Sequence, residues 1–214
     1  MYRIVCLLCI SWVWTGCSRK AETPPTLPYY NTPDFTPIFL PVGNDPVSTI
    51  PHTTGSFTLF NQDSIRVTES LVKGKIHIAN FMFTSCGSIC PTMTRNMKII
   101  SDSLANDSGI VLLSFSVMPW IDQPSVLKKY NQTHGIKNPN WHFLTGAKGA
   151  IYSLARRSYF AEEDLGFTKD SSEFLHTEHI ILADENQRIR GIYNGTLLLE
   201  MEHLLEDIRT LQQE

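Results

Sequence analysis

The chain has 214 residues, of which 42% are hydrophobic and 18% charged, and its formal net charge is −3. This length and composition suit one globular domain with further segments at its ends. The small negative charge, with no basic run longer than two residues, argues against nucleic-acid binding, because phosphate contacts need concentrated Lys and Arg.

The N-terminus has the layout of a secretory signal peptide. Arg3 is positively charged, residues 4–14 are almost wholly apolar, and small residues lead to Cys17. We expect residues 1–16 to be the signal peptide. Cys17 resembles the lipid-modified cysteine of the bacterial lipobox, although Trp14 stands where Leu is usual. An ordinary signal peptide and an uncleaved anchor are the alternatives, and each of the three exports the domain.

Residues 17–54 are interpreted as a lipid-anchored, proline-rich tether and arm. Proline at high density opposes both helices and central strands, so we expect an extended segment that holds the domain away from the membrane. The prolines are Pro24, Pro25, Pro28, Pro33, Pro37, Pro41, Pro46 and Pro51. Residues 55–214 are expected to form the folded domain.

The first half of this domain predicts a hairpin, a strand and a helix. Residues 57–60 and 65–67 read as two strands around a polar turn. The apolar run 76–83 suits a strand buried on both faces. An apolar stripe at helical spacing follows, with Pro91 in its first turn. The stripe is Cys90, Met93, Met97, Ile100 and Leu104.

The second half continues the alternation of strands and helices. We expect strands at 110–117 and 141–144, with a helix between them that Asp122 caps and that ends near His134. A helix over 147–157, two strands at 179–183 and 188–193, and a C-terminal helix from Leu197 complete the series. This order predicts an α/β fold with a central mixed sheet flanked by helices and an N-terminal hairpin.

Export leaves two cysteines in the mature domain. Cys6 and Cys9 lie in the signal peptide and Cys17 is the expected lipid site, so only Cys86 and Cys90 remain. Four positions span roughly 6 Å of helical rise, which permits either a disulfide or binding of one ion by both sulfurs. A bridge closing so short a loop stabilises a fold little. The pair is therefore predicted to be functional.

Thiolates at the start of a helix favour soft metal ions, above all Cu(I). Histidine is the natural third ligand, and His176 and His179 lie at the start of a late strand. Three positions apart on a strand, their side chains point to opposite faces. Composition does not choose between them.

Several segments, taken in order, resemble the Sco/SenC family of copper chaperones for cytochrome c oxidase assembly, over roughly residues 55–212. The first segment, 81–91, contains Cys86-Gly87-Ser88-Ile89-Cys90-Pro91. The others are 122–124, 127–130, 141–146, 175–177 and 189–195.

The resemblance implies a thioredoxin-like, three-layer fold and a copper ion, Cu(I) or Cu(II), held by Cys86, Cys90 and His176, with His179 in reserve. It implies delivery of copper to the binuclear copper centre of cytochrome c oxidase from the outer face of the membrane. Its partners would be the copper-accepting subunit or other copper proteins. The expected location is the periplasmic side of the cell envelope, with the membrane reached through lipidated Cys17.

The chain departs from the family pattern at three positions near the site. Gly87 follows the first cysteine where Pro is frequent, Met118 replaces an acidic residue, and Leu175 replaces Asp before the histidine. These departures bear on the partner and on metal affinity more than on the ligand set.

A second hypothesis is a thiol-disulfide reductase that keeps cysteines of the oxidase subunit reduced. In it, Cys86 and Cys90 are a redox-active catalytic pair, Cys86 attacks the partner, and the histidine is dispensable. The sequence favours a metallochaperone over an enzyme without excluding this activity. A redox or copper sensor is a third hypothesis, which only the reactive pair supports.

Overall fold

Two adjacent strands in which every residue is buried form the centre of the sheet. These strands, β5 (Ile76–Met82) and β6 (Ile110–Ser116), run parallel and in register from Ile76↔Ile110 to Met82↔Ser116. Their near-continuous apolar sequences fit strands that are covered on both faces. Because the two carboxyl ends lie side by side, the loops that follow them meet at one edge of the sheet.

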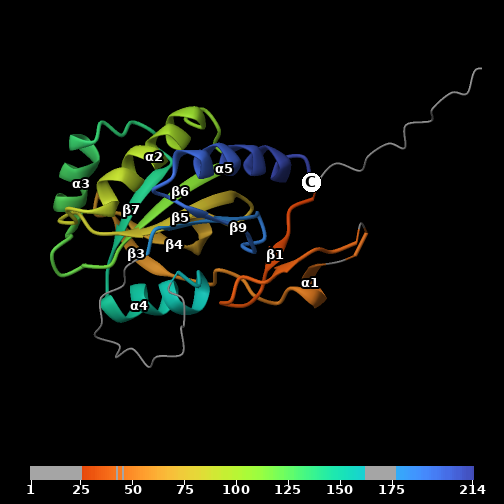
Figure 1. Ribbon diagram of the computed structural model, residues 1–214. Helices are drawn as coiled ribbons and strands as arrows, with labels where there is room; N and C mark the ends of the chain where they lie inside the picture. The colour runs from red at the N-terminus through yellow and green to blue at the C-terminus, as the bar shows by residue number, and fades with distance from the viewer. Residues whose placement is uncertain (1–25, 42, 45, 162–176) are drawn as a thin grey trace, which may run out of the picture.

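The computed structural model describes residues 26–41, 43–44, 46–161 and 177–214. Within these residues the strands form one mixed sheet in the order β2-β1-β9-β8-β5-β6-β7-β3-β4 (Figure 1). The remaining strands are β1 (Tyr29–Tyr30), β2 (Pro37–Ile38), β3 (Thr58–Asn61), β4 (Arg66–Thr68), β7 (Trp141–Thr145), β8 (His179–Ala183) and β9 (Ile189–Asn194).

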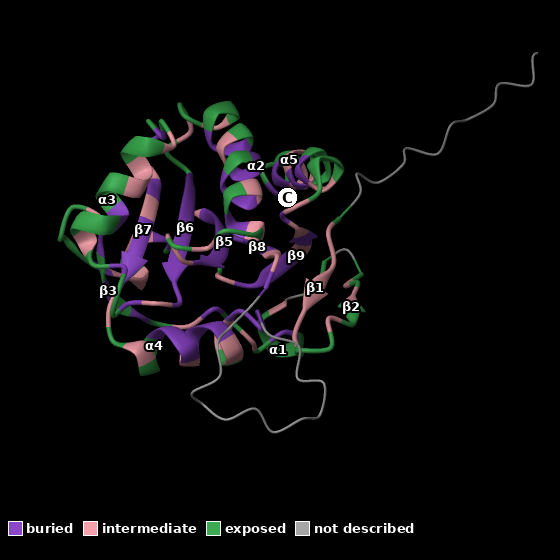
Figure 2. Cartoon of the chain, turned by 60° about the vertical axis from the view of Figure 1, so that its left-hand side comes forward, coloured by how far each residue is buried: buried purple, intermediate pink, exposed green. Residues whose placement is uncertain are grey.

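Helices cover both faces of the sheet. Figure 2 shows α2, α3 and α5 on one face and α4 on the other. The helices are α1 (Pro46–Thr49), α2 (Ile89–Ser103), α3 (Pro124–Thr133), α4 (Lys148–Ser153) and α5 (Leu198–Leu211), with a 3-10 turn η1 (Glu69–Leu71) and a π-helical turn η2 (Leu154–Ser158). None of the helices in the described residues has the length and apolar character needed to cross a bilayer.

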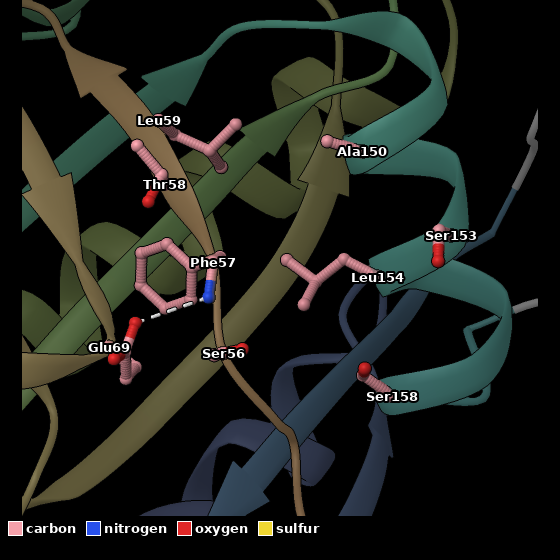
Figure 3. A pocket seen from close by; sticks show the side chains of 9 residues that line it. All are labelled: Ser56, Phe57, Thr58, Leu59, Glu69, Ala150, Ser153, Leu154 and Ser158. Atoms are coloured by element: carbon pink, nitrogen blue, oxygen red, sulfur yellow. Dashed lines mark hydrogen bonds between the residues drawn. The ribbon is translucent and has the colours of Figure 1, made fainter.

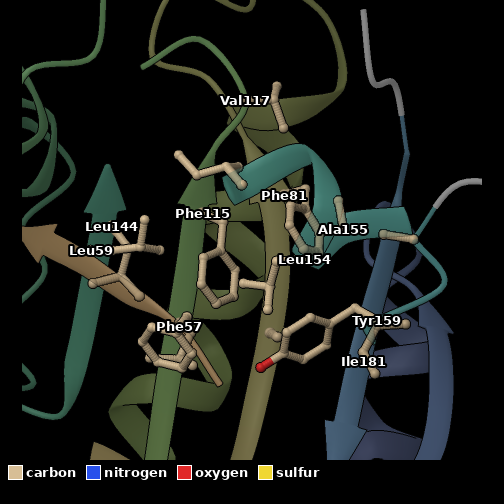
Figure 4. Packing of buried hydrophobic residues seen from close by; sticks show 14 of the residues in the cluster. Phe57, Leu59, Phe81, Phe115, Val117, Leu144, Leu154, Ala155, Tyr159 and Ile181 are labelled. Carbon is tan, nitrogen blue, oxygen red and sulfur yellow. The ribbon is translucent and has the colours of Figure 1, made fainter. Parts of the chain in front are cut away.

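Each face of the sheet has its own hydrophobic core. On the α4 side, Phe81 and Phe115 stack with ring centroids 5.1 Å apart, and Tyr159 and Leu154 pack beside them (Figure 4). On the α2 side the core includes the predicted stripe of α2, of which Met93, Met97 and Ile100 are fully buried, together with Cys90. The predicted α/β class, with its three layers and its hairpin of β3 and β4, is confirmed.

The described part of the proline-rich segment packs against the domain. Tyr30 in β1 pairs with Ile189 of β9, Ile50 is fully buried, and the His52 ring lies 2.8 Å from the carbonyl oxygen of Ser158. Although an extended arm was expected here, from residue 26 onward this segment adds two short strands to the sheet. The signal peptide 1–16 and Cys17 lie outside the described residues.

Candidate functional site

Both cysteines lie at the carboxyl end of β5, where the chain turns into α2. Cys86 is in the connecting loop and half-buried, while Cys90 is in the first turn of the helix and only 4% exposed. The loop begins as a tight turn, with the Cys86 amide donating to the carbonyl of Phe83 at 3.3 Å. Neither cysteine forms a disulfide. The structure thus places the pair at the strand-helix junction, as the sequence predicts.

The sulfur of Cys86 occupies the place of an N-terminal cap of α2. Ser88, which precedes the helix, makes no side-chain capping bond. Burial raises the pKa of Cys86, but hydrogen bonds from the amides of Cys90, Ser88 and Ile89 and from the Cys90 thiol outweigh it, and the net pKa is lowered. Amides at a helix N-terminus stabilise an anion, so Cys86 is the thiol that ionises first.

Cys90 is in the opposite situation. Burial raises its pKa strongly, and the neighbouring Cys86 sulfur raises it further by hydrogen bonding and by charge repulsion. Its S–H therefore remains protonated and donates to the Cys86 sulfur. Since the two sulfurs are in hydrogen-bonding contact, they are close enough to bind one soft ion or to form a disulfide after oxidation.

A buried carboxylate connects the cysteine loop to the end of β6. Asp122 is fully buried and accepts hydrogen bonds from the Thr84 amide at 3.0 Å, the Thr84 hydroxyl at 2.5 Å and the Ser116 hydroxyl at 2.6 Å. We expected Asp122 to cap the following helix, but Gln123 is the residue at that position, without a side-chain cap. Asp122 instead holds the loop two residues before Cys86.

The phenol of Tyr130, on α3, lies against the same core as Cys90. Its oxygen and the Thr94 hydroxyl are 2.8 Å apart, and Thr94 is one helical turn beyond Cys90. Burial raises the pKa of Tyr130, the hydrogen bond with Thr94 lowers it, and negative charge on Cys86 and Asp122 raises it again. The phenol therefore stays neutral beside the pair. Segments 122–124 and 127–130 carry the family resemblance, but nothing in their sequence indicates that Tyr130 lies near the cysteines.

The expected third ligand, His176, lies outside the described residues. His179 is in β8 on the same face as Ile181, in the core on the α4 side, and its ring meets Phe35 edge-on at 5.6 Å. Cys90 belongs to the core on the other face, so His179 is not brought to the cysteines. No group of three or more His, Cys, Asp or Glu residues arranged to hold a metal occurs within the described ranges.

A separate cavity of about 480 Å³ lies between β3 and α4, on the side of the sheet away from Cys90 (Figure 3). The Glu69 carboxylate accepts a hydrogen bond from the Phe57 amide at 3.4 Å at its margin. Its lining residues are Ser56, Phe57, Thr58, Leu59, Glu69, Ala150, Ser153, Leu154 and Ser158. Neither cysteine contributes to it, so the cavity is not part of the thiol site.

A mixed sheet flanked by helices, with two thiols of unequal burial and pKa at a strand-helix junction, is the arrangement of a thioredoxin-like protein. The SCO1/SenC family model matches residues 47–213. The chain belongs to this family. The predicted family is thereby confirmed.

Individual relatives agree with this assignment. A SCO1 protein homolog of Bacillus subtilis is 31% identical over 156 residues, which is 72% of this chain and 80% of the relative. A second relative is BsSco, described as a member of the Sco family of cytochrome c oxidase assembly proteins with a disulfide switch. Its structure matches this one with a TM-score of 0.64 and 29% identity, over 76% of this chain and 94% of BsSco. Copper-bound ScoI of Bradyrhizobium japonicum has a TM-score of 0.58 and 26% identity over 73% and 98% of the two chains.

Proposed function

We propose that this protein binds copper and delivers it to the binuclear copper centre of cytochrome c oxidase. The observation that carries the proposal is the pair of reduced sulfurs of Cys86 and Cys90, in contact with each other at the N-terminus of α2. Membership in a family with copper-bound structures, among them ScoI of Bradyrhizobium japonicum, supports it.

The residues present fit a soft metal ion. Cys86 ionises readily, and Cys90 loses its proton as the metal binds, since thiolate is the ligand form. We assign the third position to His176 as a neutral imidazole. Two sulfurs and one nitrogen leave the coordination open on one side, where a ligand of the acceptor protein can enter before the donor ligands leave.

The proposed location follows from the N-terminal segment. We propose that residues 1–16 direct export and that a lipid on Cys17 holds the domain on the periplasmic side of the membrane. This location would place the thiol pair in the compartment that the copper centre of the oxidase faces. Palmitate labelling of the wild type and of Cys17→Ala tests the anchor, and equal labelling of both would contradict it.

Copper binding is tested by titrating the reduced full-length protein with Cu(I) and Cu(II). We expect one copper per chain in the wild type, and a loss of affinity of about 10-fold or more in Cys86→Ser, Cys90→Ser and His176→Ala. His179→Ala and His203→Ala are the matched controls. Unchanged affinity of His176→Ala in both oxidation states would remove this residue from the ligand set.

A second candidate function is reduction of disulfides in the oxidase subunit, which the unequal pKa shifts of the two thiols favour. The Cys86 thiolate attacks a partner disulfide, forms a mixed disulfide and releases one partner thiolate. Cys90 then gives up its proton and attacks the Cys86 sulfur, which releases the second partner thiolate. Two electrons pass to the partner, the proton from Cys90 is taken up by one of the released partner thiolates, and the Cys86–Cys90 disulfide remains.

Trapping distinguishes this candidate. Cys90→Ser should accumulate a mixed disulfide with the oxidase subunit through Cys86, whereas Cys86→Ser should not, because Cys90 is buried and protonated. Non-reducing electrophoresis detects the adduct. Copper transfer by the wild type with no adduct in Cys90→Ser would exclude the reductase function.

A further inference from the structure

Met118 differs from the other methionines of the described chain. Met82, Met93, Met97 and Met201 are at most 1% exposed and belong to the core on the α2 side. Met118 is partly exposed and belongs to neither hydrophobic core. Packing therefore explains the other four side chains but does not explain this one.

The backbone fixes Met118 beside the cysteine loop. The Val117 amide donates to the carbonyl of Met82 at 2.9 Å, which continues the pairing of β6 with β5 to the point where the loop begins. The Met118 amide donates to the Ser116 hydroxyl at 3.1 Å, and that hydroxyl donates to Asp122. Asp122 also holds Thr84 of the loop, so one network positions both segments.

The Met118 side chain contacts the residue that precedes Cys86. Its Sδ accepts a hydrogen bond from the Ser85 hydroxyl at 4.0 Å, and Ser85 directly precedes Cys86. A thioether is a weak hydrogen-bond acceptor, so this contact is released at little cost. Ser85 is exposed, which leaves its hydroxyl free to turn to water when the sulfur finds a stronger partner.

We infer that Met118 is an additional soft ligand of the site, which binds the Cu(I) state beside Cys86 and Cys90. The inference rests on the proposed copper function and adds a residue to it. A thioether is neutral at every pH and prefers soft ions, so it stabilises Cu(I) more than Cu(II). In this role Met118 shifts the bound copper toward Cu(I) and supplies a sulfur ligand that needs no deprotonation.

Substitution by leucine tests the role of the sulfur, because leucine keeps a similar volume and apolar character. With the full-length reduced protein and a competing chelator, Met118→Leu should bind Cu(I) about 10-fold more weakly and Cu(II) within about twofold of wild type. Met97→Leu makes the same chemical change in the core and should leave both affinities unchanged. Equal Cu(I) affinity in wild type and Met118→Leu would overturn the inference.

A spectroscopic measurement reports the bond itself. In protein labelled with selenomethionine and loaded with Cu(I), absorption at the selenium edge should show a copper neighbour, and Met118→Leu should abolish it. A signal that persists in Met118→Leu, or no copper neighbour in the labelled wild type, would refute the inference while leaving copper binding intact. Failure of the wild type to bind Cu(I) would instead refute the proposed function, and this inference with it.

Discussion

Asp122 shows how one side chain can organise a site without taking part in its chemistry. Its buried carboxylate receives donors from Thr84, next to the cysteine loop, and from Ser116, at the end of β6. A buried charge is tolerated when several donors surround it, and removing it leaves those donors without partners. Asp122 therefore contributes to stability and to the position of Cys86 together.

Replacing this carboxylate should be costly. We expect Asp122→Ala to lower the free energy of unfolding by about 3 kcal/mol, because the buried hydroxyl of Ser116 and the partly buried donors of Thr84 lose their acceptor. Asp63→Ala is the control, since its ion pair with Lys128 at 2.9 Å is exposed and should contribute less than about 1 kcal/mol. Urea unfolding measures both, and equal losses would contradict this role for Asp122.

At the scale of elements, Arg190 of β9 fastens the N-terminal segment to the sheet. Its buried guanidinium donates to the carbonyls of Leu27 and Pro28 at 2.8 and 3.0 Å and lies 3.9 Å from the ring centroid of Tyr29. It also pairs with Glu214 at 2.7 Å and with Asp184 at 3.5 Å. One side chain thus joins β1, β9 and the residues that follow α5.

Removing this group should release the segment before the domain unfolds. Arg190→Ala removes a charged partner from the buried Asp184 carboxylate and the donors to the Leu27 and Pro28 carbonyls. We therefore expect a loss of about 3 kcal/mol in the free energy of unfolding and faster amide exchange at Tyr30. Arg209→Ala, an exposed change on α5, should alter neither quantity. If Arg190→Ala does not fold, Arg190→Lys can be measured instead, because it keeps the charge but loses the planar fork. Exchange at Tyr30 unchanged in the variant would show that β1 is held by other contacts.

For the whole molecule, buried histidines make stability depend on pH. Complete burial lowers the pKa of His77 to about 4, whereas an unfolded histidine titrates near about 6.5. Between these values the unfolded chain binds a proton that the folded chain does not. Stability is therefore full above about pH 6.5 and falls on acidification, by up to about 1.4 kcal/mol per pH unit. Burial also lowers the pKa of His52 and His142, which adds to the slope in the same direction.

His77→Gln should reduce this pH slope. We expect the variant to be less stable at pH 7, because the substitution disturbs the 3.1 Å hydrogen bond between the His77 ring and the Tyr159 hydroxyl. Its stability should nevertheless decline less than that of the wild type between pH 6.5 and 4. His203→Gln, an exposed change on α5, should retain the full slope. Chemical unfolding at several pH values gives the comparison. Parallel slopes in wild type and His77→Gln would contradict the assignment.

Local pattern was sufficient for most of the fold. The apolar runs that became β5 and β6, and the helical stripe from Cys90 to Ile100, depend on neighbours within a few residues, so periodicity predicts them. The arm was harder, because Tyr30 pairs with Ile189 across most of the chain. Asp122 before Pro124 has the pattern of a helix cap, yet its donor Thr84 is 38 positions away. A pattern read over neighbouring residues cannot predict a hydrogen-bond partner that is so distant in the sequence.

The sequence by itself determined that Cys86 and Cys90 are the two cysteines left after the predicted signal peptide and lipid site, and that they follow a buried strand. It also contained the motifs by which the family was recognised. Only the tertiary structure decided that Cys86 caps α2 while Cys90 is buried, that His179 points to the opposite face, and that Met118 lies against Ser85. The reason is physical: acidity and ligand reach depend on burial and on contacts between segments, and these exist only once distant parts of the chain have packed together.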